Sequence, residues 1–259
     1  MTALEITPIP LLSDNYAWLI RDVDQDVTVV VDPSEAAPVV AYLRQRHLRL
    51  DAVLNTHHHP DHTGGNLGLK EAFGCDIIGA EADRHRIAGL DRGLGEGDTY
   101  QVGRFTAKVI AIPGHTLGHI AFVFTEPAAV FCGDTLFSLG CGRLFEGSPE
   151  QMWTSLSRLA ALPPATMVCC GHEYTAANAA FALTVDPDNQ ALQQRAKAVA
   201  ELRSGPVPQP SVPSSIGLEL ATNPFLHPLA GAVLRHLKLP PSSSAAAAFA
   251  ALRLLKDRF

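Results

Sequence analysis

The sequence predicts an α/β protein that ends in a small helical domain. Short β-rich runs alternate with helical segments up to about residue 174, and each cluster of histidine and aspartate side chains directly follows one of these runs. After that point the chain becomes rich in alanine, leucine and glutamine at helical spacing. Because α/β sheets carry their chemistry at the carboxyl ends of strands, we expect these clusters to meet at one edge.

Turn residues and apolar spacing set the limits of the expected elements. Residues 13–15 and 22–26 are turn-forming, and they separate three β-rich runs that read as an antiparallel opening to the sheet. The expected strands are residues 4–9, 16–21, 27–31, 52–55, 77–78, 105–112, 120–124, 129–132 and 167–170. The expected helices are residues 35–46, 67–73, 81–88, 149–161, 176–183 and 189–203, with further helical pieces after a Pro/Ser-rich loop at 205–215. The glycine-rich run 92–98 neither follows a strand nor opens a helix, so we interpret it as a plain turn.

Composition excludes several classes of protein. With 20 basic against 26 acidic residues among 259, the formal charge is −6, which argues against general binding to nucleic acid or to an anionic membrane. The five cysteines have no C-x-x-C spacing, so neither a disulfide framework nor a cysteine zinc site is expected. The sequence shows no leader pattern and no run of 18 apolar residues, and we expect a cytoplasmic protein.

The stretch 56–62 is the strongest chemical signal in the chain. It reads Thr-His-His-His-Pro-Asp-His, which places four of the 11 histidines and a carboxylate within seven residues. A short apolar run precedes it, and two glycines that permit a tight turn follow it. Imidazole and carboxylate ligands suit Zn²⁺, Fe²⁺ or Mn²⁺. The stretch therefore predicts a metal site rather than a solvated polar loop.

Four motifs in order resemble the metallo-β-lactamase superfamily. They are Thr56-His57-x-His59-x-Asp61-His62, Gly114-His115-Thr116-x-Gly118-His119, Gly133-Asp134-Thr135 and Gly171-His172-Glu173-Tyr174. The segment from Cys132 to Arg143, the triplet Asn223-Pro224-Phe225 and the terminal Arg253-x-x-Lys256-Asp257-x-Phe259 resemble its glyoxalase II branch, the hydroxyacylglutathione hydrolases.

The resemblance implies a fold, a domain division and a set of metal ligands. The fold would be a four-layer αβ/βα sandwich, with residues 1–174 as a metal-binding catalytic domain and residues 175–259 as a helical substrate-binding domain. Two divalent metal ions are implied, and we expect zinc, with iron or manganese as alternatives. The ligands carried over from the family are His57, His59 and His115 for one ion, Asp61, His62 and His172 for the other, and Asp134 as the bridge. His58 and His119 fall on positions that do not bind metal.

The implied activity is hydrolysis of a thioester. In the family, a metal-bridging hydroxide attacks the carbonyl of an S-2-hydroxyacyl glutathione, typically S-D-lactoylglutathione, in the second step of methylglyoxal detoxification. A metal-bound water can have its pKa lowered to about 7, so no separate strong base is needed. The chain has no G-x-S-x-G nucleophile elbow, in agreement with such chemistry. Asp61 and Asp134 are the expected catalytic carboxylates, and Asp61 can also orient the hydroxide.

Glutathione binding is implied for four residues, Arg143, Tyr174, Arg253 and Lys256. Cationic groups in an otherwise acidic chain suit a partner with two carboxylates. Arg143 stands where the family often has lysine, and Phe145 stands where it often has tyrosine, so the thiol carrier is less firmly indicated than the metals. We expect a monomer whose partner is a small-molecule glutathione thioester, with no nucleic acid and no membrane.

Other functions remain open at this point. A lactonase, a different thioesterase or a mononuclear-iron persulfide dioxygenase could use the same fold, although the full second ligand set argues against a mononuclear centre. A nuclease or phosphodiesterase lacks a visible basic exosite. A metal-storage or interaction module would bind metal without turnover.

Overall fold

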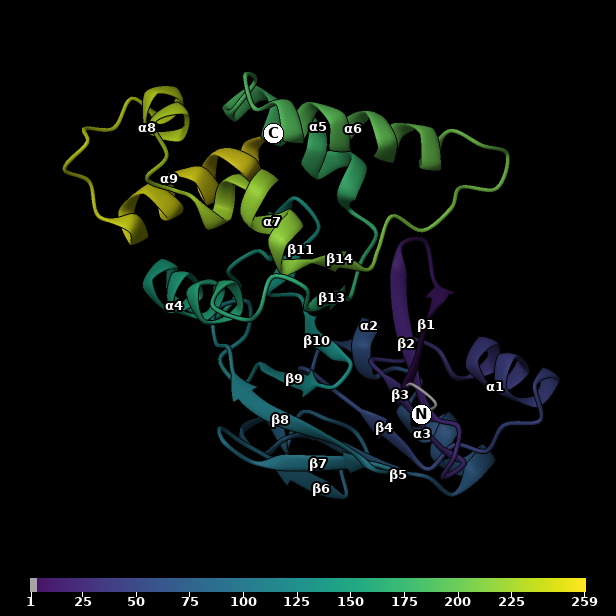
Figure 1. Ribbon diagram of the computed structural model, residues 1–259. Coiled ribbons are helices and arrows are strands. Elements are labelled where there is room, and N and C mark those ends of the chain that lie inside the picture. Colours follow the sequence, from purple (N-terminus) through teal and green to yellow (C-terminus); the bar gives the residue numbers. More distant parts are fainter. Residues whose placement is uncertain (1–3) are drawn as a thin grey trace. The chain divides into compact units, whose positions relative to one another are not determined.

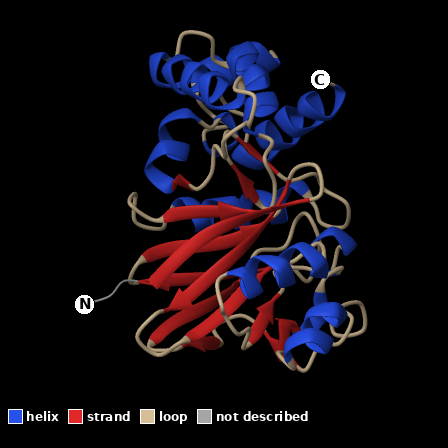
Figure 2. Cartoon of the chain, turned by 90° about the vertical axis from the view of Figure 1, so that its right-hand side faces the viewer, coloured by secondary structure: helices blue, strands red, loops and turns tan. Residues whose placement is uncertain are grey.

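The computed structural model describes residues 4–259, and these form two compact units (Figure 1). Unit 1 contains the chain up to Ala111 together with Gly118–Gly133, and unit 2 contains Ile112–Leu117 and Asp134–Phe259. Most of the strands belong to unit 1 and most of the helices to unit 2. Figure 2 distinguishes the strands, in red, from the helices, in blue. The expected α/β architecture with a helical C-terminal part is therefore present.

The first sheet of unit 1 is mixed, with the order β1-β2-β3-β4-β5-β6. Strands β1, β2 and β3 are antiparallel, and β3 to β6 are parallel to their neighbours. The strands are β1 (Leu4–Leu11), β2 (Asn15–Asp22), β3 (Val27–Val31), β4 (Ala52–Leu54), β5 (Asp76–Ala80) and β6 (Arg92–Leu94). Helix α1 (Ala36–Gln45) connects β3 to β4, and α2 (Pro60–Thr63) and α3 (Asn66–Phe73) connect β4 to β5. The carboxyl ends of β3 and β4 consequently lie side by side.

Unit 1 also contains four strands of a second sheet, which pair as antiparallel neighbours in the order β10-β9-β8-β7. These are β7 (Thr99–Val102), β8 (Phe105–Ala111), β9 (Ile120–Thr125) and β10 (Ala128–Gly133). Trp18 of β2 packs edge-on against Phe131 of β10, with ring centroids 6.3 Å apart. Since both rings are fully buried, the two sheets face each other across an aromatic core.

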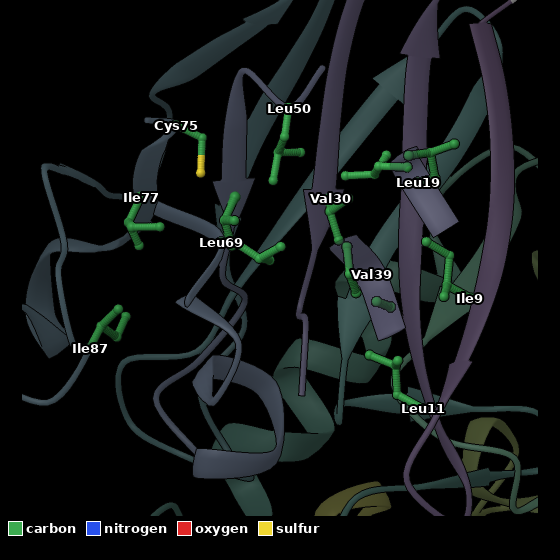
Figure 3. Close-up of a cluster of buried hydrophobic side chains, with 13 residues drawn as sticks. Ile9, Leu11, Leu19, Val30, Val39, Leu50, Leu69, Cys75, Ile77 and Ile87 are labelled. Atoms are coloured by element: carbon green, nitrogen blue, oxygen red, sulfur yellow. The ribbon is translucent and has the colours of Figure 1, made fainter. Parts of the chain in front are cut away.

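Helices α1 and α3 cover the other face of the first sheet (Figure 3). Alternate residues of β2, Ala17 and Leu19, point to this face and pack with Val39 of α1, while Leu69 of α3 belongs to the same buried cluster. Successive side chains of a strand point to opposite faces, so Trp18 between them faces the second sheet. Strands buried on both faces explain the nearly continuous apolar run of residues 27–31.

Unit 2 is mainly helical. Its helices are α4 (Pro149–Ala160), α5 (Thr175–Val185), α6 (Gln190–Arg203), α7 (Ile216–Thr222), α8 (Gly231–Leu237) and α9 (Ala245–Arg258). Helix α4 begins with a capping box, in which Ser148 accepts from the backbone N–H of Gln151 and the side chain of Gln151 accepts from the backbone of Ser148. Four short strands accompany the helices: β11 (Leu136–Phe137) pairs with β12 (Gly140–Cys141), and β13 (Met167–Cys170) pairs with β14 (Ser214–Ser215).

Two expectations from the sequence were wrong. Residues 81–88 form only a 3-10 turn, Glu81–Asp83, and the buried Asp83 carboxylate in it faces Nδ1 of His58, a tertiary contact that overrides the local helical preference. Residues 92–94 are the strand β6 and not part of a plain turn, since they pair with β5 in register with Ile78. The other long strands and helices lie within a few residues of the expected limits.

Candidate metal centre

The histidine-rich stretch of unit 1 is a loop that leaves β4 and turns into α2. Pro60 opens this helix at its first position, where a missing N–H costs nothing, and the backbone of His59 forms the N-cap. Asp61 and His62 therefore lie on one short helical turn, and His57 and His59 lie on the extended segment before it. Local geometry thus presents the side chains of the motif from two directions.

The donor atoms of this stretch are close together. The Nε2 atom of His57 lies 3.1 Å from Nδ1 of His59, and Nε2 of His62 lies 3.7 Å from Oδ2 of Asp61. His57 and His62 are almost completely buried, whereas the Asp61 side chain is 41% exposed. The Asp61 backbone carbonyl accepts hydrogen bonds from Asn15 and Ser34, which fixes the position of that residue.

Asp32, at the end of β3, organises the same loop, although the sequence reasoning did not identify it. Its carboxylate accepts hydrogen bonds from the backbone N–H and the hydroxyl of Thr56, at 2.8 and 2.6 Å. It also lies 3.1 Å from Nδ1 of His62, so this nitrogen donates and leaves Nε2 with its lone pair. Ligand atoms of Asp32, His57 and His62 all lie within 4.8 Å of one another. The signal in the sequence was an aspartate directly after a buried strand parallel to β4.

His58 and His119 have protein contacts of their own. Nδ1 of His58 lies 3.1 Å from the Asp83 carboxylate. The ring of His119 stacks on that of His57, with centroids 4.6 Å apart and an interplanar angle of 13°. Gly133 is needed beside these residues, because a Cβ there would come within 2.2 Å of the Thr56 hydroxyl and its φ is +46°.

Unit 2 contains three further donor residues, His115, Asp134 and His172. The Nε2 atoms of the two histidines lie 3.5 and 3.3 Å from the same oxygen, Oδ2 of Asp134. All three side chains are at least nine-tenths buried. Nδ1 of His115 lies 2.8 Å from the carbonyl oxygen of Arg143 and donates to it, so Nε2 is the nitrogen that can bind a metal.

The expected substrate-binding residues all belong to unit 2, but they differ in accessibility. Tyr174 is 38% exposed and stacks on the His172 ring at 4.7 Å, and the Arg143 side chain is 66% exposed with Nε 3.6 Å from Asp257. Arg253, by contrast, is only 5% exposed, and it donates to the carbonyl of Cys141 and to the carboxylate of Asp257.

Lys256 lies one turn after Arg253 on α9. Its ammonium nitrogen lies 5.5 and 5.3 Å from the ring centroids of Phe181 and Phe259. Partial burial, and then the charges of Arg253 and Arg143, hold the pKa of this lysine below its ordinary value. Lys256 therefore lies in a positively charged and partly apolar environment that favours an anion.

The donor chemistry of both units fits divalent transition metals. Each unit contributes imidazoles and an acidic side chain, and in one histidine of each unit, His62 and His115, a hydrogen bond at Nδ1 leaves Nε2 available to a metal. Such mixed nitrogen and oxygen ligands are typical of zinc, iron and manganese sites.

The comparisons with known proteins identify the class to which this fold and these donors belong. Residues 12–172 match the metallo-beta-lactamase superfamily, and this chain is a member of that superfamily, with His and Asp groups suited to binding a metal ion pair. Residues 173–259 match the hydroxyacylglutathione hydrolase C-terminus. The chain is 52% identical over 256 residues to the hydroxyacylglutathione hydrolase of Methylococcus capsulatus, covering 99% of both proteins. It therefore belongs to the hydroxyacylglutathione hydrolase family, the glyoxalase II branch expected from its motifs.

Solved structures agree with this assignment of the fold. ETHE1 from Myxococcus xanthus aligns with a TM-score of 0.65 and 25% identity, covering 97% of this chain and 99% of that one. TTHA1623 in a di-iron-bound form aligns with a TM-score of 0.61 and 29% identity, covering 85% of this chain and 100% of that one. The expected metallo-β-lactamase fold is confirmed. In the described part of the chain, no helix combines the length and the apolar character needed to span a membrane.

Proposed function

We propose that this chain hydrolyses S-2-hydroxyacyl glutathione, typically S-D-lactoylglutathione, to glutathione and a 2-hydroxy acid. The observation that carries this proposal is the match of both parts of the chain to one family, at about half identity along its full length. The protein is accordingly a thioester hydrolase of the glyoxalase II type. In a cell it would act as the second step of methylglyoxal detoxification.

We assign the metal ligands as two sets with a shared carboxylate. His57, His59 and His115 would hold one ion, Asp61, His62 and His172 the other, and Asp134 both. Two bound cations supply Lewis-acid activation of water and of a thioester carbonyl. Zinc is the metal we expect, and iron or manganese would suit the same donors.

The protein's own side chains have separate roles in this proposal. Asp61, which is partly exposed and held through its backbone by Asn15 and Ser34, would orient the attacking water. Asp134 presents one oxygen, Oδ2, close to Nε2 of both His115 and His172, so a bound cation would be shared by the carboxylate and the imidazoles. A thiol has a pKa near 8.5, so the leaving thiolate needs no obligatory proton donor.

We further propose that glutathione is held by Arg143, Tyr174, Arg253 and Lys256. Arg143 and Lys256 offer the accessible charges, and Tyr174 offers an aromatic face beside His172. Arg253 is buried, so it would act on the same anion through its charge and by its influence on Lys256. Residues 1–174 would form the catalytic domain and residues 175–259 the substrate-binding domain of a cytoplasmic monomer.

One parallel assay tests the proposal. Purified protein is given S-D-lactoylglutathione, a homoserine lactone and glutathione persulfide, and its metal content is measured by elemental analysis. We expect turnover of the thioester and two metal ions per chain. Faster turnover of the lactone or the persulfide than of the thioester would show that the proposed substrate is wrong. Two bound metals without any turnover would indicate a metal-binding module. One tightly bound metal in fully active protein would contradict the ligand assignment but not the thioesterase activity.

A further inference from the structure

The β11–β12 hairpin of unit 2 cannot hold its own shape. Each strand has two residues, and the turn between them consists of Ser138 and Leu139. Leu139 has a φ of +60°, which is uncommon for a residue with a branched side chain and persists only where the surroundings enforce it. An isolated two-stranded hairpin is marginal in water even when its strands are longer. The conformation of this hairpin must therefore be imposed from outside.

Side chains of the surrounding helices supply that constraint. The carbonyl of Ser138 accepts from Asn178 of α5 at 3.0 Å, and the N–H of Leu139 donates to Glu219 of α7 at 2.9 Å. The carbonyls of Phe137 and Gly140 both accept from Asn223, at 3.3 and 3.0 Å, and the carbonyl of Cys141 accepts from Arg253. The Leu139 side chain is fully buried among Ala179, Ala182 and Leu192. The hairpin is thus fixed by polar groups on its backbone and by apolar packing at its tip.

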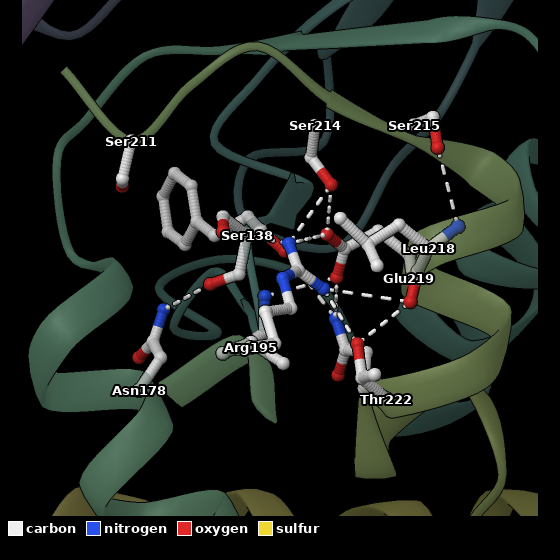
Figure 4. A network of polar contacts seen from close by, with 12 residues as sticks. Ser138, Asn178, Arg195, Ser211, Ser214, Ser215, Leu218, Glu219 and Thr222 are labelled. Atoms are coloured by element: carbon white, nitrogen blue, oxygen red, sulfur yellow. Dashed lines mark hydrogen bonds and ion pairs between the residues drawn. The ribbon is translucent and has the colours of Figure 1, made fainter. Parts of the chain in front are cut away.

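A buried ion pair organises these contacts (Figure 4). Arg195 of α6 is 9% exposed and Glu219 is 0% exposed, and the two side chains are directly hydrogen-bonded. Arg195 also donates to the hydroxyl of Ser138, and Glu219 also accepts from Asn223. Buried ion pairs add little net stability compared with apolar packing, so a pair in this position points to a requirement for defined geometry.

The two ends of the hairpin carry groups of the metal centre. Asp134 lies two residues before β11, and Gly142 directly follows β12 with its N–H bonded to the carbonyl of Thr135. A Cβ at Gly142 would lie 1.9 Å from the carbonyl oxygen of Asp134, so the chain leaving the hairpin is packed against the ligand's backbone. The next residue, Arg143, supplies the carbonyl that accepts from His115.

We propose that Asn178, Arg195, Glu219 and Asn223 are positioning residues of the metal centre, which hold the β11–β12 hairpin so that its ends fix Asp134 and His115. The proposal rests on the metal assignment made above. It gives the C-terminal helices a second task besides substrate binding, because α5, α6 and α7, with Asn223 directly after α7, contribute side chains that determine the geometry of metal ligands. Partners behind metal ligands typically change metal affinity or activity by about 10- to 100-fold when they are removed.

The test compares variants that remove hairpin contacts with one that disturbs the same network elsewhere. Asn223→Ala removes the side chain that donates to the carbonyls of Phe137 and Gly140, and Asn178→Ala removes the side chain that donates to the carbonyl of Ser138. Thr222→Val is the matched control: its hydroxyl accepts from Arg195 and donates to the carbonyl of Leu218, so its hydrogen bonds among the described residues go to helices α6 and α7 and not to the hairpin backbone. Metal affinity is measured for each protein by competition with a chromophoric chelator in the absence of substrate, alongside kcat, KM and the melting temperature.

We expect Asn223→Ala to weaken metal binding and lower kcat by roughly 10- to 100-fold, with Asn178→Ala intermediate and KM little changed. Thr222→Val should lose thermal stability but keep metal affinity and kcat within about threefold of wild type, since it removes one hydrogen bond to Arg195 and leaves the contacts with the hairpin intact. If Asn223→Ala fails to fold, the milder Asn178→Ala decides. The proposal would be overturned if both asparagine variants bound metal as tightly as Thr222→Val does. Because the chelator assay needs no thioester, an error in the proposed substrate would leave this result intact.

Discussion

Single residues at the ends of strands determine how the histidine loop of unit 1 is arranged. The Oδ2 atom of Asp32 accepts hydrogen bonds from the hydroxyl of Thr56 and from Nδ1 of His62, and its Oδ1 atom accepts one from the backbone N–H of Thr56. The Thr56 hydroxyl in turn lies 3.1 Å from Nδ1 of His57. One carboxylate therefore orients two imidazoles, one of them directly and the other through a threonine.

Replacing Asp32 by asparagine should disrupt this arrangement without changing its size. An amide nitrogen cannot accept a hydrogen bond. If it occupies the place of Oδ2, it faces the two groups that now donate to that oxygen. We expect Asp32→Asn to weaken metal binding by roughly 10- to 100-fold, measured by chelator competition. Asp51→Asn is the control, because that carboxylate also accepts a backbone N–H, from Thr28, but lies at the amino end of β4. Unchanged metal affinity in Asp32→Asn would mean that Asp32 has no orienting role.

Arg253 and Lys256 lie one turn apart but differ in their surroundings, so their variants should differ in kind. The Arg253 fork binds the Cys141 carbonyl and Asp257, a geometry that lysine cannot reproduce. We expect Arg253→Lys to lower the free energy of unfolding by about 1.5–3 kcal/mol. Lys256→Ala should instead raise KM for the thioester about 10- to 100-fold at nearly constant kcat, since one charged contact is lost uniformly. Melting curves and steady-state kinetics on both variants check this, and a normal KM for Lys256→Ala would remove the residue from the proposed site.

The lowered pKa of Lys256 also predicts a dependence of KM on pH. Burial and the neighbouring arginines favour the neutral amine, so the lysine loses its proton at a lower pH than its ordinary value of 10.5. The charged form binds the substrate anion, and KM should therefore begin to rise at a pH below that value. Lys256→Arg, which keeps its proton, should move the rise to higher pH. Identical KM profiles for the two proteins would contradict this role.

At the scale of elements, local sequence predicted what local forces decide. The β-rich run 16–21 between two turns and the helix expected at 149–161 are such cases, and both elements formed close to the expected limits. The segment 81–88 did not form the expected helix, and its buried Asp83 is bound to His58, a contact between distant residues that no short window of sequence contains. The sequence also did not predict strand β6, for a related reason: its three residues form a strand by pairing with β5. Likewise, the hairpin at 136–141 is too short for any pattern to reveal it.

The base of that hairpin offers a prediction about a single glycine. A Cβ at Gly142 would lie 1.9 Å from the Asp134 carbonyl and 3.2 Å from Nδ1 of His115, so the hairpin must shift away from both. We expect Gly142→Ala to reduce metal content and kcat severely, as elemental analysis and kinetics would record. Gly205→Ala is the matched control, because the nearest atom to its Cβ would be 3.8 Å away, which is ordinary contact. Full metal content in Gly142→Ala would show that the backbone there can yield.

At the scale of the whole molecule, the path of the chain differs from a simple division into two consecutive domains. The chain passes between the compact units after Ala111, after Leu117 and after Gly133, so neither unit is one continuous segment. The sequence could not indicate this, because the change in composition near residue 174 reports only where strands give way to helices. The ligand assignment was accessible from the motifs, whereas Asp32 and the Arg195–Glu219 pair depend on contacts between distant residues.

This interleaved path predicts that the two units unfold together, and the cysteines can report on it. All five are buried, Cys75 and Cys132 in unit 1 and Cys141, Cys169 and Cys170 in unit 2. Burial raises the pKa of the Cys75 and Cys141 thiols to about 11 and that of Cys170 to about 12. Since the thiolate is the reactive form, none of these three should react at neutral pH until its unit opens.

Brief pulses of a thiol reagent at increasing denaturant concentration, followed by mass spectrometry of peptides, would give a separate unfolding curve for each cysteine. Because the chain crosses between the units three times, at the end of β8, before β9 and at the end of β10, the two units are covalently linked at three points, and we expect the five curves to coincide. An earlier transition for the three thiols of unit 2 would show that the helical part opens independently. In that case Asn223→Ala should move only the earlier transition to lower denaturant, since its contacts lie wholly within unit 2.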